Sequence, residues 1–433
     1  MKHVHFIGIG GVGMSALAQA ALDKQYRVSG SDRLLGMGQE TPILATLRNE
    51  GVSLFPQDGS AIASQPDLVV YSTAIESDNP DLLAAHAAHI TTLHRSEALA
   101  SLSTGHELIA ITGTCGKSSV TALLGHLLAS CGLDPFVVNG AEVATWDNSN
   151  TRIGSVRASS NPHGLMVVEA DESDKSLMAL NPTHVIVTNA SSDHFPKAEA
   201  EALFAAFKSK ATGHVIDTTL SAPEPPPAGE GWEARFTWQG REWVLPMPGA
   251  HNVANAKVAL EMALRLGCSP DDLAHALTTF RGVRRRLERT GQYAGATVID
   301  DYAHNIEKLA AAWTTLQQAF PNGVFGVWRP HGYAPLRKML TGLAEMFKAT
   351  LRPCDRLFLL PVYDAGGTAS RTVSSDDLLA LLPDSPAQGV ASLEEATARL
   401  RALARPGTAL AFFGARDSGL ARYAHLLGNE EQS

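Results

Sequence analysis

Residues Gly113-Thr-Cys-Gly-Lys-Ser-Ser119 are the part of the chain whose types and spacing most clearly suggest chemistry. The apolar residues 108–111 before them predict a buried parallel strand, and apolar residues at 120, 123, 124, 127 and 128 predict a helix after them. A glycine-rich turn between a strand and a helix directs backbone N–H groups and the positive helix end at an anion. The stretch therefore predicts a phosphate-binding turn.

Two side chains of this turn have defined tasks in such a site. Lys117 would reach the outer phosphates of a nucleotide, and the Ser118 hydroxyl would hold Mg²⁺. The common motif has a further glycine five places before Gly116, and Ile111 stands there instead. The prediction of nucleotide binding therefore depends on the order of strand, turn and helix rather than on the complete motif.

A second glycine-rich turn lies near the N-terminus. Gly8, Gly10 and Gly13 follow a strand pattern at 4–9, and Asp32 follows the next predicted strand. This arrangement is typical of dinucleotide-binding units, and the same turn can hold any pyrophosphate. NAD, another pyrophosphate ligand and a tight turn without a ligand are the alternatives.

Acids, a histidine and two asparagines complete the set of candidates. The segment 169–174, Glu-Ala-Asp-Glu-Ser-Asp, follows a predicted strand at 165–168, and Asp193-His194 follows another at 183–188. The carboxyl ends of parallel strands are where a phosphate-bound Mg²⁺ would be met; a solvated acidic loop and a surface histidine are the alternatives. Asn252 and Asn255 at a helix start would either grip a purine or cap the helix.

Composition excludes several classes of protein. The chain has 433 residues, is 45% hydrophobic and 18% charged, and carries a net charge of -9 without a long basic run, so nucleic acid is not expected as a partner. None of its four cysteines forms a Cys-x-x-Cys pair, which argues against a disulfide framework or a structural zinc site. No signal peptide or apolar run of membrane-span length is present, so we expect a cytoplasmic protein without membrane insertion.

Alternating strand and helix patterns predict an α/β protein of three domains. We expect a Rossmann-like parallel sheet at 1–103, a central P-loop-like α/β domain at 104–284 and a Rossmann-like α/β domain at 285–433. A hairpin is expected at 232–245 with its turn at Gln239-Gly240, and a charged hinge at 281–289. The ends of the predicted strands collect the candidate residues.

Taken in order, these motifs resemble the Mur ligase family, the ATP-dependent amide-forming enzymes of peptidoglycan precursor synthesis. The resemblance spans nearly the whole chain. It rests on the turns at 8–15 and 112–119, Tyr71-Ser-Thr-Ala-Ile75, Asp78-Asn-Pro80, the segment 169–174, Thr188-Asn189, Asp193-His194, Pro248-Gly-x-His-Asn-x-x-Asn255 and Asp300-Asp-Tyr-x-His304.

The resemblance implies a role for each matching position. An amino acid, with L-alanine favoured, would be joined to the carboxylate of UDP-N-acetylmuramate through an acyl phosphate; a short peptide acceptor, as in murein-peptide recycling, is the alternative. The implied UDP-sugar ligands are Gly8, Gly10, Gly11, Gly13, Ser15, Asp32 and Ser72. The implied ATP ligands are Gly113, Thr114, Cys115, Gly116, Lys117, Ser118, Ser119, Asn252, Asn255 and Arg285. The implied Mg²⁺ ligands are Ser118, Glu169 and His194; Lys117, Glu169, His194, Asp301 and His304 would be catalytic, and Tyr302, His331 and Arg337 would lie on the acceptor side. A monomer or a homodimer is expected.

The chain departs from the family pattern chiefly on the acceptor side. Cys115, Ser118 and Ser119 replace a histidine and two threonines of the phosphate turn, and serine can still bind Mg²⁺. Cys115 is either a reactive thiol at a helix N-terminus or simply a small turn residue. Two arginines expected near the acceptor's carboxylate are absent from 330–335, and Arg337 or Arg371 would have to replace them.

Two readings from other classes remain. The first glycine turn alone favours an NAD-dependent oxidoreductase, which leaves the Gly-Lys-Ser turn without a purpose. A non-catalytic nucleotide-binding regulator is the other, and the presence of Lys117, Glu169 and His194 argues against it.

Overall fold

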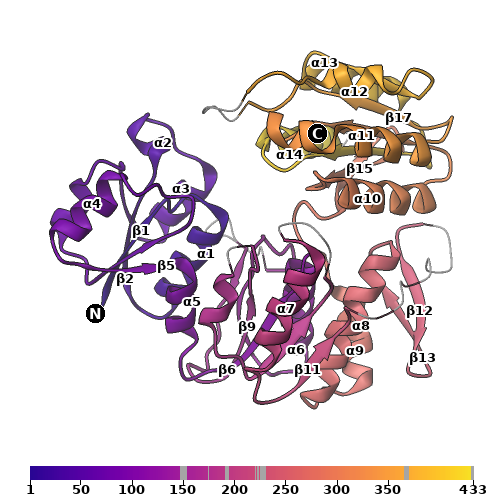
Figure 1. Ribbon diagram of the computed structural model, residues 1–433. Coiled ribbons are helices and arrows are strands. Elements are labelled where there is room, and N and C mark those ends of the chain that lie inside the picture. The colour runs from indigo at the N-terminus through magenta and orange to yellow at the C-terminus, as the bar shows by residue number, and fades with distance from the viewer. Residues whose placement is uncertain are drawn as a thin grey trace. The chain divides into compact units, whose positions relative to one another are not determined.

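The computed structural model describes residues 1–146, 154–173, 175–190, 195–219, 221, 224, 231–364 and 370–430 (Figure 1). It forms two compact units, one of residues 1–223 with 254–283 and one of residues 224–253 with 284–433. Helices alternate with strands that are mostly parallel, which confirms the predicted α/β class. The three predicted domain ranges each contain one large sheet, and their boundaries stay a prediction.

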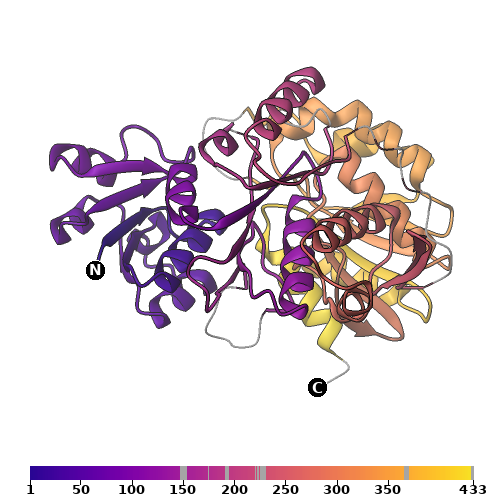
Figure 2. The same ribbon diagram turned by 90° about the horizontal axis from the view of Figure 1, so that it is seen from below.

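The first sheet is wholly parallel, in the order β3-β2-β1-β4-β5. Its middle strand β1 is buried along its whole length, with Val4 and Phe6 in one core cluster and Ile7 in another. Helices therefore cover both faces (Figures 1 and 2). The elements are β1 (His3–Ile7), α1 (Val12–Asp23), β2 (Arg27–Ser31), α2 (Arg33–Gly36), α3 (Pro42–Asn49), β3 (Ser53–Phe55), β4 (Leu68–Tyr71), α4 (Pro80–Ala87), β5 (Thr91–His94) and α5 (Arg95–Ser103).

The second sheet has the order β11-β10-β6-β9-β7-β8, and β6, which enters the phosphate turn, lies between β10 and β9. Leu108 to Ile111 are all buried, as expected for a central parallel strand covered on both faces. The elements are β6 (Glu107–Thr112), α6 (Lys117–Ser130), β7 (Phe136–Val138), β8 (Val156–Arg157), β9 (Leu165–Glu169), β10 (His184–Val187), α7 (Lys197–Lys208) and β11 (Val215–Asp217); α8 (Ala250–Arg265) and α9 (Pro270–Thr279) follow later in the chain.

The second unit contains the third sheet, in the order β14-β15-β19-β16-β17-β18, and the hairpin of β12 (Ala234–Trp238) and β13 (Arg241–Leu245). Gln239 and Gly240 both have positive φ, 50° and 73°, as a two-residue hairpin turn requires. The remaining elements are β14 (Glu288–Tyr293), β15 (Ala296–Asp301), α10 (Ile306–Ala319), β16 (Val324–Trp328), α11 (Tyr333–Thr350), β17 (Arg356–Leu359), α12 (Ser375–Ala380), β18 (Ala387–Gly389), α13 (Leu393–Leu403), β19 (Ala409–Phe413) and α14 (Ser418–Asn429).

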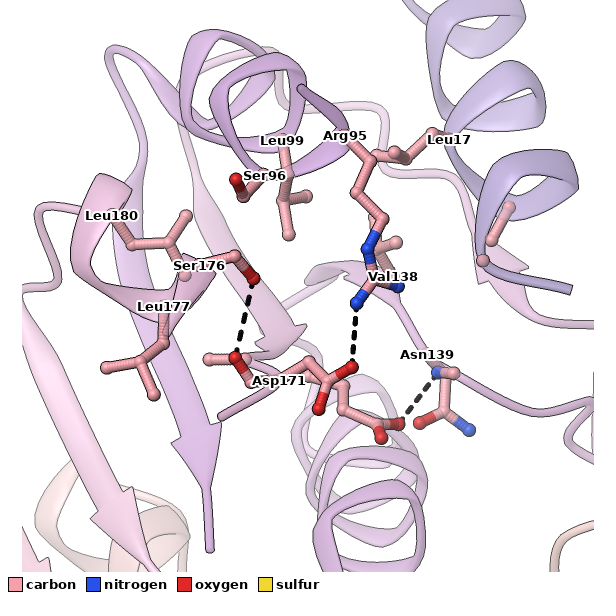
Figure 3. A pocket seen from close by; sticks show the side chains of 15 residues that line it. Leu17, Arg95, Ser96, Leu99, Val138, Asn139, Asp171, Ser176, Leu177 and Leu180 are labelled. Carbon is pink, nitrogen blue, oxygen red and sulfur yellow. Dashed lines mark hydrogen bonds and ion pairs between the residues drawn. The ribbon is translucent and has the colours of Figure 1, made fainter. Parts of the chain in front are cut away.

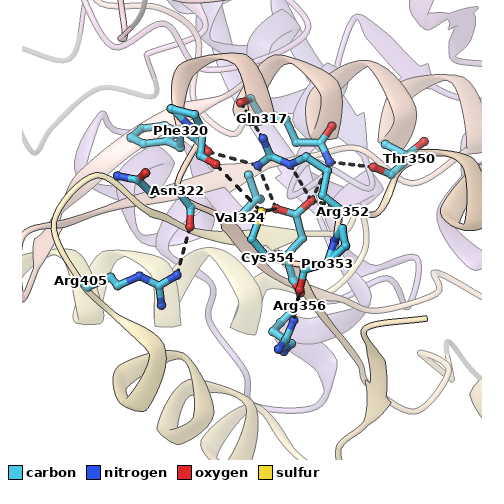
Figure 4. A network of polar contacts seen from close by, with 12 residues as sticks. Gln317, Phe320, Asn322, Val324, Thr350, Arg352, Pro353, Cys354, Arg356 and Arg405 are labelled. Carbon is cyan, nitrogen blue, oxygen red and sulfur yellow. Dashed lines mark hydrogen bonds and ion pairs between the residues drawn. The ribbon is translucent and has the colours of Figure 1, made fainter. Parts of the chain in front are cut away.

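A polar network built on Asp355 fixes the loops where β16 and β17 begin (Figure 4). The Asp355 carboxylate accepts hydrogen bonds from the Val324 N–H at 2.9 Å, from Gln317 Nε2 at 2.7 Å and from Arg352 Nη2 at 2.9 Å. Asp355 is fully buried. Because burying a carboxylate is costly unless it is paired, this set of donors stabilises the edge of the third sheet opposite the strand carboxyl ends.

Two antiparallel edge strands were not predicted from the sequence. β14 pairs antiparallel with β15, and β8 pairs antiparallel with β7, beside otherwise parallel neighbours. The predicted charged hinge at 281–289 contains the boundary between the two units, at 283/284, and its last two residues begin β14.

Candidate active site

The phosphate turn connects β6 to α6 as predicted. Gly113 and Gly116 have φ of 129° and 86°, conformations that side chains rarely adopt. A Cβ atom on Gly113 would lie 2.2 Å from Thr188 Oγ1, and one on Gly116 would lie 2.6 Å from Asn255 Oδ1. The two glycines therefore permit both the turn and its close packing, and they bring Asn255 of α8 to the phosphate turn.

Asn189, two residues after the end of β10, holds the turn from the neighbouring strand. Its Oδ1 accepts the Cys115 N–H at 2.9 Å, and its Nδ2 donates to the Cys115 carbonyl at 3.0 Å. Thr188 Oγ1 donates to the same carbonyl at 2.6 Å. The backbone of Cys115 is thus fixed by its neighbours, and its side chain is half-buried in the turn.

Lys117, the first residue of α6, is engaged by protein groups. Its Nζ donates to Glu172 Oε2 at 2.6 Å and to the Gly113 carbonyl at 2.9 Å. Burial alone would lower the pKa of Lys117, but the charges of Glu172, Glu169 and Asp171 outweigh it and raise that pKa. The ammonium is therefore held in its charged form at the place where a phosphate would be met.

The acids after β9 form the other wall of this site. Glu169 Oε2 accepts the Gly140 N–H at 2.8 Å, and Asp171 Oδ2 accepts Arg95 Nη2 at 2.7 Å (Figure 3). Burial would raise the pKa of Asp171, yet Lys117 and Arg95 together hold it below its usual value. Three carboxylates on one short segment thus surround a single ammonium.

The side-chain oxygens of Glu172 and Ser118, near Lys117, are of the kind that binds Mg²⁺. Glu172 Oε1 is buried without a hydrogen-bond partner, and the Ser118 side chain is buried in the first turn of α6. Carboxylate and hydroxyl oxygens are the ligands that Mg²⁺ prefers. Across the described ranges, no group of three or more His, Cys, Asp and Glu residues has the geometry of a metal centre. His194 and Asp193 lie outside the described residues.

Asp32, the acid that was predicted to accompany the N-terminal glycine turn, accepts hydrogen bonds from the backbone of that turn and of the helix after β2. Asp32 Oδ2 accepts the Gly10 N–H at 3.1 Å, and Asp32 Oδ1 accepts the Leu34 N–H at 3.0 Å. Gly8, with φ of 74°, closes the turn by accepting the Gly11 N–H at 3.0 Å. The structure therefore gives Asp32 a role in shaping the turn, and a role in ligand binding stays a prediction.

Three more of the predicted UDP-sugar ligands surround this turn. Ser15 is buried in α1, where its hydroxyl donates to the Val12 carbonyl at 3.0 Å. Gly13 lies in the first turn of α1, and Ser72 directly follows β4. The first sheet thus brings these residues to the carboxyl ends of β1 and β4, as predicted.

In the second unit, β15 ends in Asp300 and Asp301, which accept hydrogen bonds from an arginine and from backbone N–H groups. Asp301 is buried, with one carboxylate oxygen accepting the Leu287 N–H and the other the Ala303 N–H, both at 2.7 Å. Arg285 Nε donates to Asp300 at 3.3 Å, and the Arg285 guanidinium lies 5.0 Å from the Tyr302 ring. Burial raises the pKa of Asp300 to about 7, against the opposing charge of Arg285. Asp301 therefore shapes the loop, and its proposed work on the amine stays a prediction.

His304 and His331 do come together. Their ring centroids are 4.9 Å apart, and the rings are nearly perpendicular. His304 Nδ1 donates to the Tyr302 carbonyl at 2.9 Å, which leaves Nε2 as the acceptor of a neutral ring. Burial lowers the pKa of His304 to about 4. A neutral imidazole beside a second histidine can accept a hydrogen bond from an amine.

Both arginines named as replacements on the acceptor side have local partners. Arg337 Nη2 donates to the Ser370 carbonyl at 2.8 Å, and Arg371 pairs with Asp364 at 2.7 Å. Arg416 was not predicted, yet its Nη1 would lie 3.9 Å from a Cβ atom on Gly332. Its position three residues after β19 was the signal that could have identified it.

Other residues of the site were also missed from the sequence. Glu172, Asn189 and Arg95 contact residues of the predicted motifs. Glu172 and Asn189 stand within motifs that were recognised, whereas Arg95 lies outside them. Asn252, on α8, donates to the Pro248 carbonyl at 2.7 Å and is buried.

Family models match three consecutive parts of the chain. The "Mur ligase family, catalytic domain" matches residues 3–107, the "Mur ligase middle domain" matches 111–210 and the "Mur ligase, glutamate ligase domain" matches 285–416. Relatives named UDP-N-acetylmuramate–L-alanine ligase align over nearly all of it. That of Rhizobium meliloti (strain 1021) is 32% identical over 95% of this chain and 93% of its own, and that of Bradyrhizobium sp. (strain ORS 278) is 31% identical over 99% and 97%.

Solved structures agree in fold. The UDP-N-acetylmuramate–alanine ligase of Thermotoga maritima superposes with a TM-score of 0.81 at 24% identity, covering 100% of this chain and 99% of its own. A murein peptide ligase from Psychrobacter arcticus superposes with a TM-score of 0.63 at 18% identity, covering 99% and 98%. Within the described ranges, every helix is too short or too polar to cross a bilayer.

Proposed function

Because the chain belongs to the Mur ligase family, we propose that it is an ATP-dependent, ADP-forming ligase that joins an amino acid to the carboxylate of UDP-N-acetylmuramate. L-Alanine is the favoured amino acid, and peptidoglycan precursor synthesis in the cytoplasm is the setting. The observation that carries the proposal is the phosphate turn, where Lys117 lies among Glu169, Asp171 and Glu172. That arrangement serves transfer of a phosphoryl group rather than of a hydride.

The chemistry explains why these groups are needed. A carboxylate is a poor electrophile, so one of its oxygens attacks the γ-phosphorus of ATP, the bond to the bridging oxygen breaks, and ADP leaves. The resulting acyl phosphate is attacked at carbon by a neutral amine, and phosphate departs from the tetrahedral intermediate. Lys117 and the N–H groups of the turn neutralise the charge that builds on the transferred phosphoryl group.

Mg²⁺ would be held by Ser118 and Glu169, with His194 as a further ligand, and would neutralise charge on the nucleotide phosphates. Asn252 and Asn255 would contact the adenine, and Arg285 the nucleotide. In this assignment residues 1–103 bind the UDP-sugar through the turn at 8–15, residues 104–284 bind ATP, and residues 285–433 receive the amine.

On the acceptor side, His304 would accept a hydrogen bond from the amine and orient it, because Nδ1 donates to the Tyr302 carbonyl and leaves Nε2 as an acceptor. His331 and Tyr302 lie beside it. Arg416, near Gly332, would supply a guanidinium for the acceptor's carboxylate. A short peptide is the alternative acceptor.

The test is phosphate release from ATP with UDP-N-acetylmuramate, screened across amino acids and short peptides, with the ligated product identified by mass. We expect release that requires both the sugar nucleotide and an amine. Lys117→Ala should reduce turnover by at least about a hundredfold, whereas Lys197→Ala, which alters an exposed residue of α7, should leave it unchanged. Turnover of Lys117→Ala within about tenfold of the original protein would contradict the mechanism.

A further inference from the structure

A cavity of about 190 Å³ lies beside the phosphate turn, within the first unit (Figure 3). Its apolar wall includes Leu17 of α1, Leu99 of α5 and Leu177. Its polar wall includes Glu169, Asp171 and Arg95. The cavity therefore joins the helix that follows the first glycine turn to the acids beside Lys117.

Arg95 is the one cationic side chain among the described residues that line this cavity. It is the first residue of α5, and its Nη2 donates to Asp171 Oδ2 at 2.7 Å. A Cβ atom on Gly13 would lie 3.2 Å from Nη1, so the second guanidinium nitrogen lies against the first turn of α1. One terminal nitrogen of the guanidinium thus meets an acid of the phosphate site, and the other lies beside the N-terminal glycine turn.

The charges around the cavity pose a problem for the proposed substrate. The acid to be phosphorylated must bring its own carboxylate close to Glu169 and Asp171, which would repel it. Only about a quarter of the Arg95 side chain is exposed, 26%, and Asp171 is 34% exposed, so water screens this repulsion incompletely. A guanidinium offers five N–H donors in a fixed plane, and Asp171 accepts one of them in the contact described.

We propose that Arg95 binds the carboxylate of the sugar-acid substrate in this cavity and that Asp171 positions the guanidinium for it. The proposal rests on the proposed function and adds to it a residue that selects the acid. The plane of the guanidinium fixes one carboxylate oxygen, so that the other faces the phosphate turn. Arg95 then distinguishes UDP-N-acetylmuramate from sugar nucleotides that lack the acid.

The test compares two ligands that differ in this group. UDP-N-acetylmuramate and UDP-N-acetylglucosamine share the nucleotide and the pyrophosphate, and the second lacks the lactyl carboxylate. Binding of each to the full chain is measured by titration calorimetry, without ATP, for the original protein and for Arg95→Gln, Arg95→Lys and Arg48→Gln. Arg48, whose ion pair with Glu40 is exposed, is the matched control.

Arg95→Gln should weaken binding of UDP-N-acetylmuramate about ten- to a hundredfold and leave binding of UDP-N-acetylglucosamine within about twofold. Arg95→Lys, which keeps the charge and loses the planar fork, should give an intermediate loss. Arg48→Gln should change neither affinity. Unfolding midpoints of all variants, measured in parallel, exclude a loss caused by misfolding.

Equal weakening for both ligands would overturn the proposal and assign Arg95 to the pyrophosphate instead. Unchanged affinity of Arg95→Gln for UDP-N-acetylmuramate would also overturn it. Both outcomes would leave the proposed function intact if the original protein still releases phosphate with UDP-N-acetylmuramate. Failure of the proposed function has a different signature, since the original protein would then neither bind that ligand nor release phosphate with it.

Discussion

The ammonium of Lys117 lies 2.6 Å from the Glu172 carboxylate, and their side chains are only 13% and 3% exposed. The lysine that should hold phosphate is thus already neutralised by a protein acid. A bound nucleotide must therefore either share the Lys117 ammonium with Glu172 or displace Glu172 from it. A stronger Lys117–Glu172 ion pair thus means a weaker affinity for the nucleotide.

Replacing Glu172 with Gln should tighten binding of metal-free ADP by about tenfold, because the phosphates would no longer compete with a carboxylate for Lys117. The same change should lower the stability of the ligand-free protein, since it leaves a buried ammonium with a weaker partner. Titration calorimetry in the presence of a chelator measures the first effect, and urea unfolding measures the second. Weaker ADP binding by a variant with a normal unfolding curve would show that Glu172 does not compete with phosphate.

Gly140→Ala should selectively impair the use of Mg²⁺. A Cβ atom at this position would lie 2.4 Å from Glu169 Oε2, and the Gly140 N–H is the donor that holds that oxygen. We expect the affinity for ATP with Mg²⁺ to fall about tenfold or more, while metal-free ADP binds nearly as before. Glu169→Gln should reproduce this pattern. Parallel losses of both affinities would instead indicate damage to the phosphate turn itself.

His304→Gln should separate acceptor chemistry from nucleotide binding. Gln can still donate to the Tyr302 carbonyl but lacks the ring nitrogen that would orient the amine, so kcat should fall about tenfold or more with little change in KM for ATP. The pKa of His304, lowered by burial from 6.5 to about 4, also predicts a stability effect. Between these pH values the unfolded chain binds a proton at His304 that the folded chain does not bind. The free energy of unfolding therefore decreases as pH falls from 6.5 toward 4.

Urea unfolding of the original protein and of His304→Gln at pH 7 and pH 5 tests the second part. The loss of unfolding free energy on acidification should be smaller in the variant, because the residue responsible for part of it is gone. An identical loss in both proteins would show that His304 is not buried as a neutral ring.

Asp355→Ala should reduce the unfolding free energy by about 3 kcal/mol, because it leaves the donors of Val324, Gln317 and Arg352 without their acceptor. Burial would raise the pKa of Asp355, but Arg352 and the backbone donors lower it overall. Its contribution to stability is therefore present above pH 3.8 and lost as pH falls below that value. Urea unfolding measures the effect, and Asp384→Ala, at an exposed position, is the control. If Asp355→Ala lowered the unfolding free energy by less than about 1 kcal/mol, the stabilising role of the network would be refuted.

Strands buried on both faces were predicted well. The predicted strands 108–111, 165–168 and 183–188 agree within one residue at each end with β6, β9 and β10, because a parallel strand covered on both sides is a continuous apolar run. β14 was missed because its sequence, Glu288-Arg-Thr-Gly-Gln-Tyr293, is polar and follows a basic stretch. As an edge strand it pairs on one side only, so apolar composition was not required.

The candidate site was predictable as motifs and not as contacts. Lys117 is 55 residues from Glu172 in sequence, and Arg95 is 76 residues from Asp171. No local periodicity relates residues so far apart, since their meeting depends on the order of strands in the sheet. Gly116 and Asn255 show the same limit, because two separate motifs proved to be neighbours only in the folded chain.

Helix α8 runs without a break from Ala250 to Arg265, although its first four residues group with the second unit and the rest with the first. The polypeptide consequently passes between the units at 223/224, 253/254 and 283/284. A gene divided at 253/254 would yield two fragments that each lack part of their own unit, and a division at 223/224 or 283/284 would leave one of the two units incomplete. Expressing the first unit by itself would require excising 224–253 and bridging the ends with a designed linker, so a simple truncation series will understate how independently the units fold.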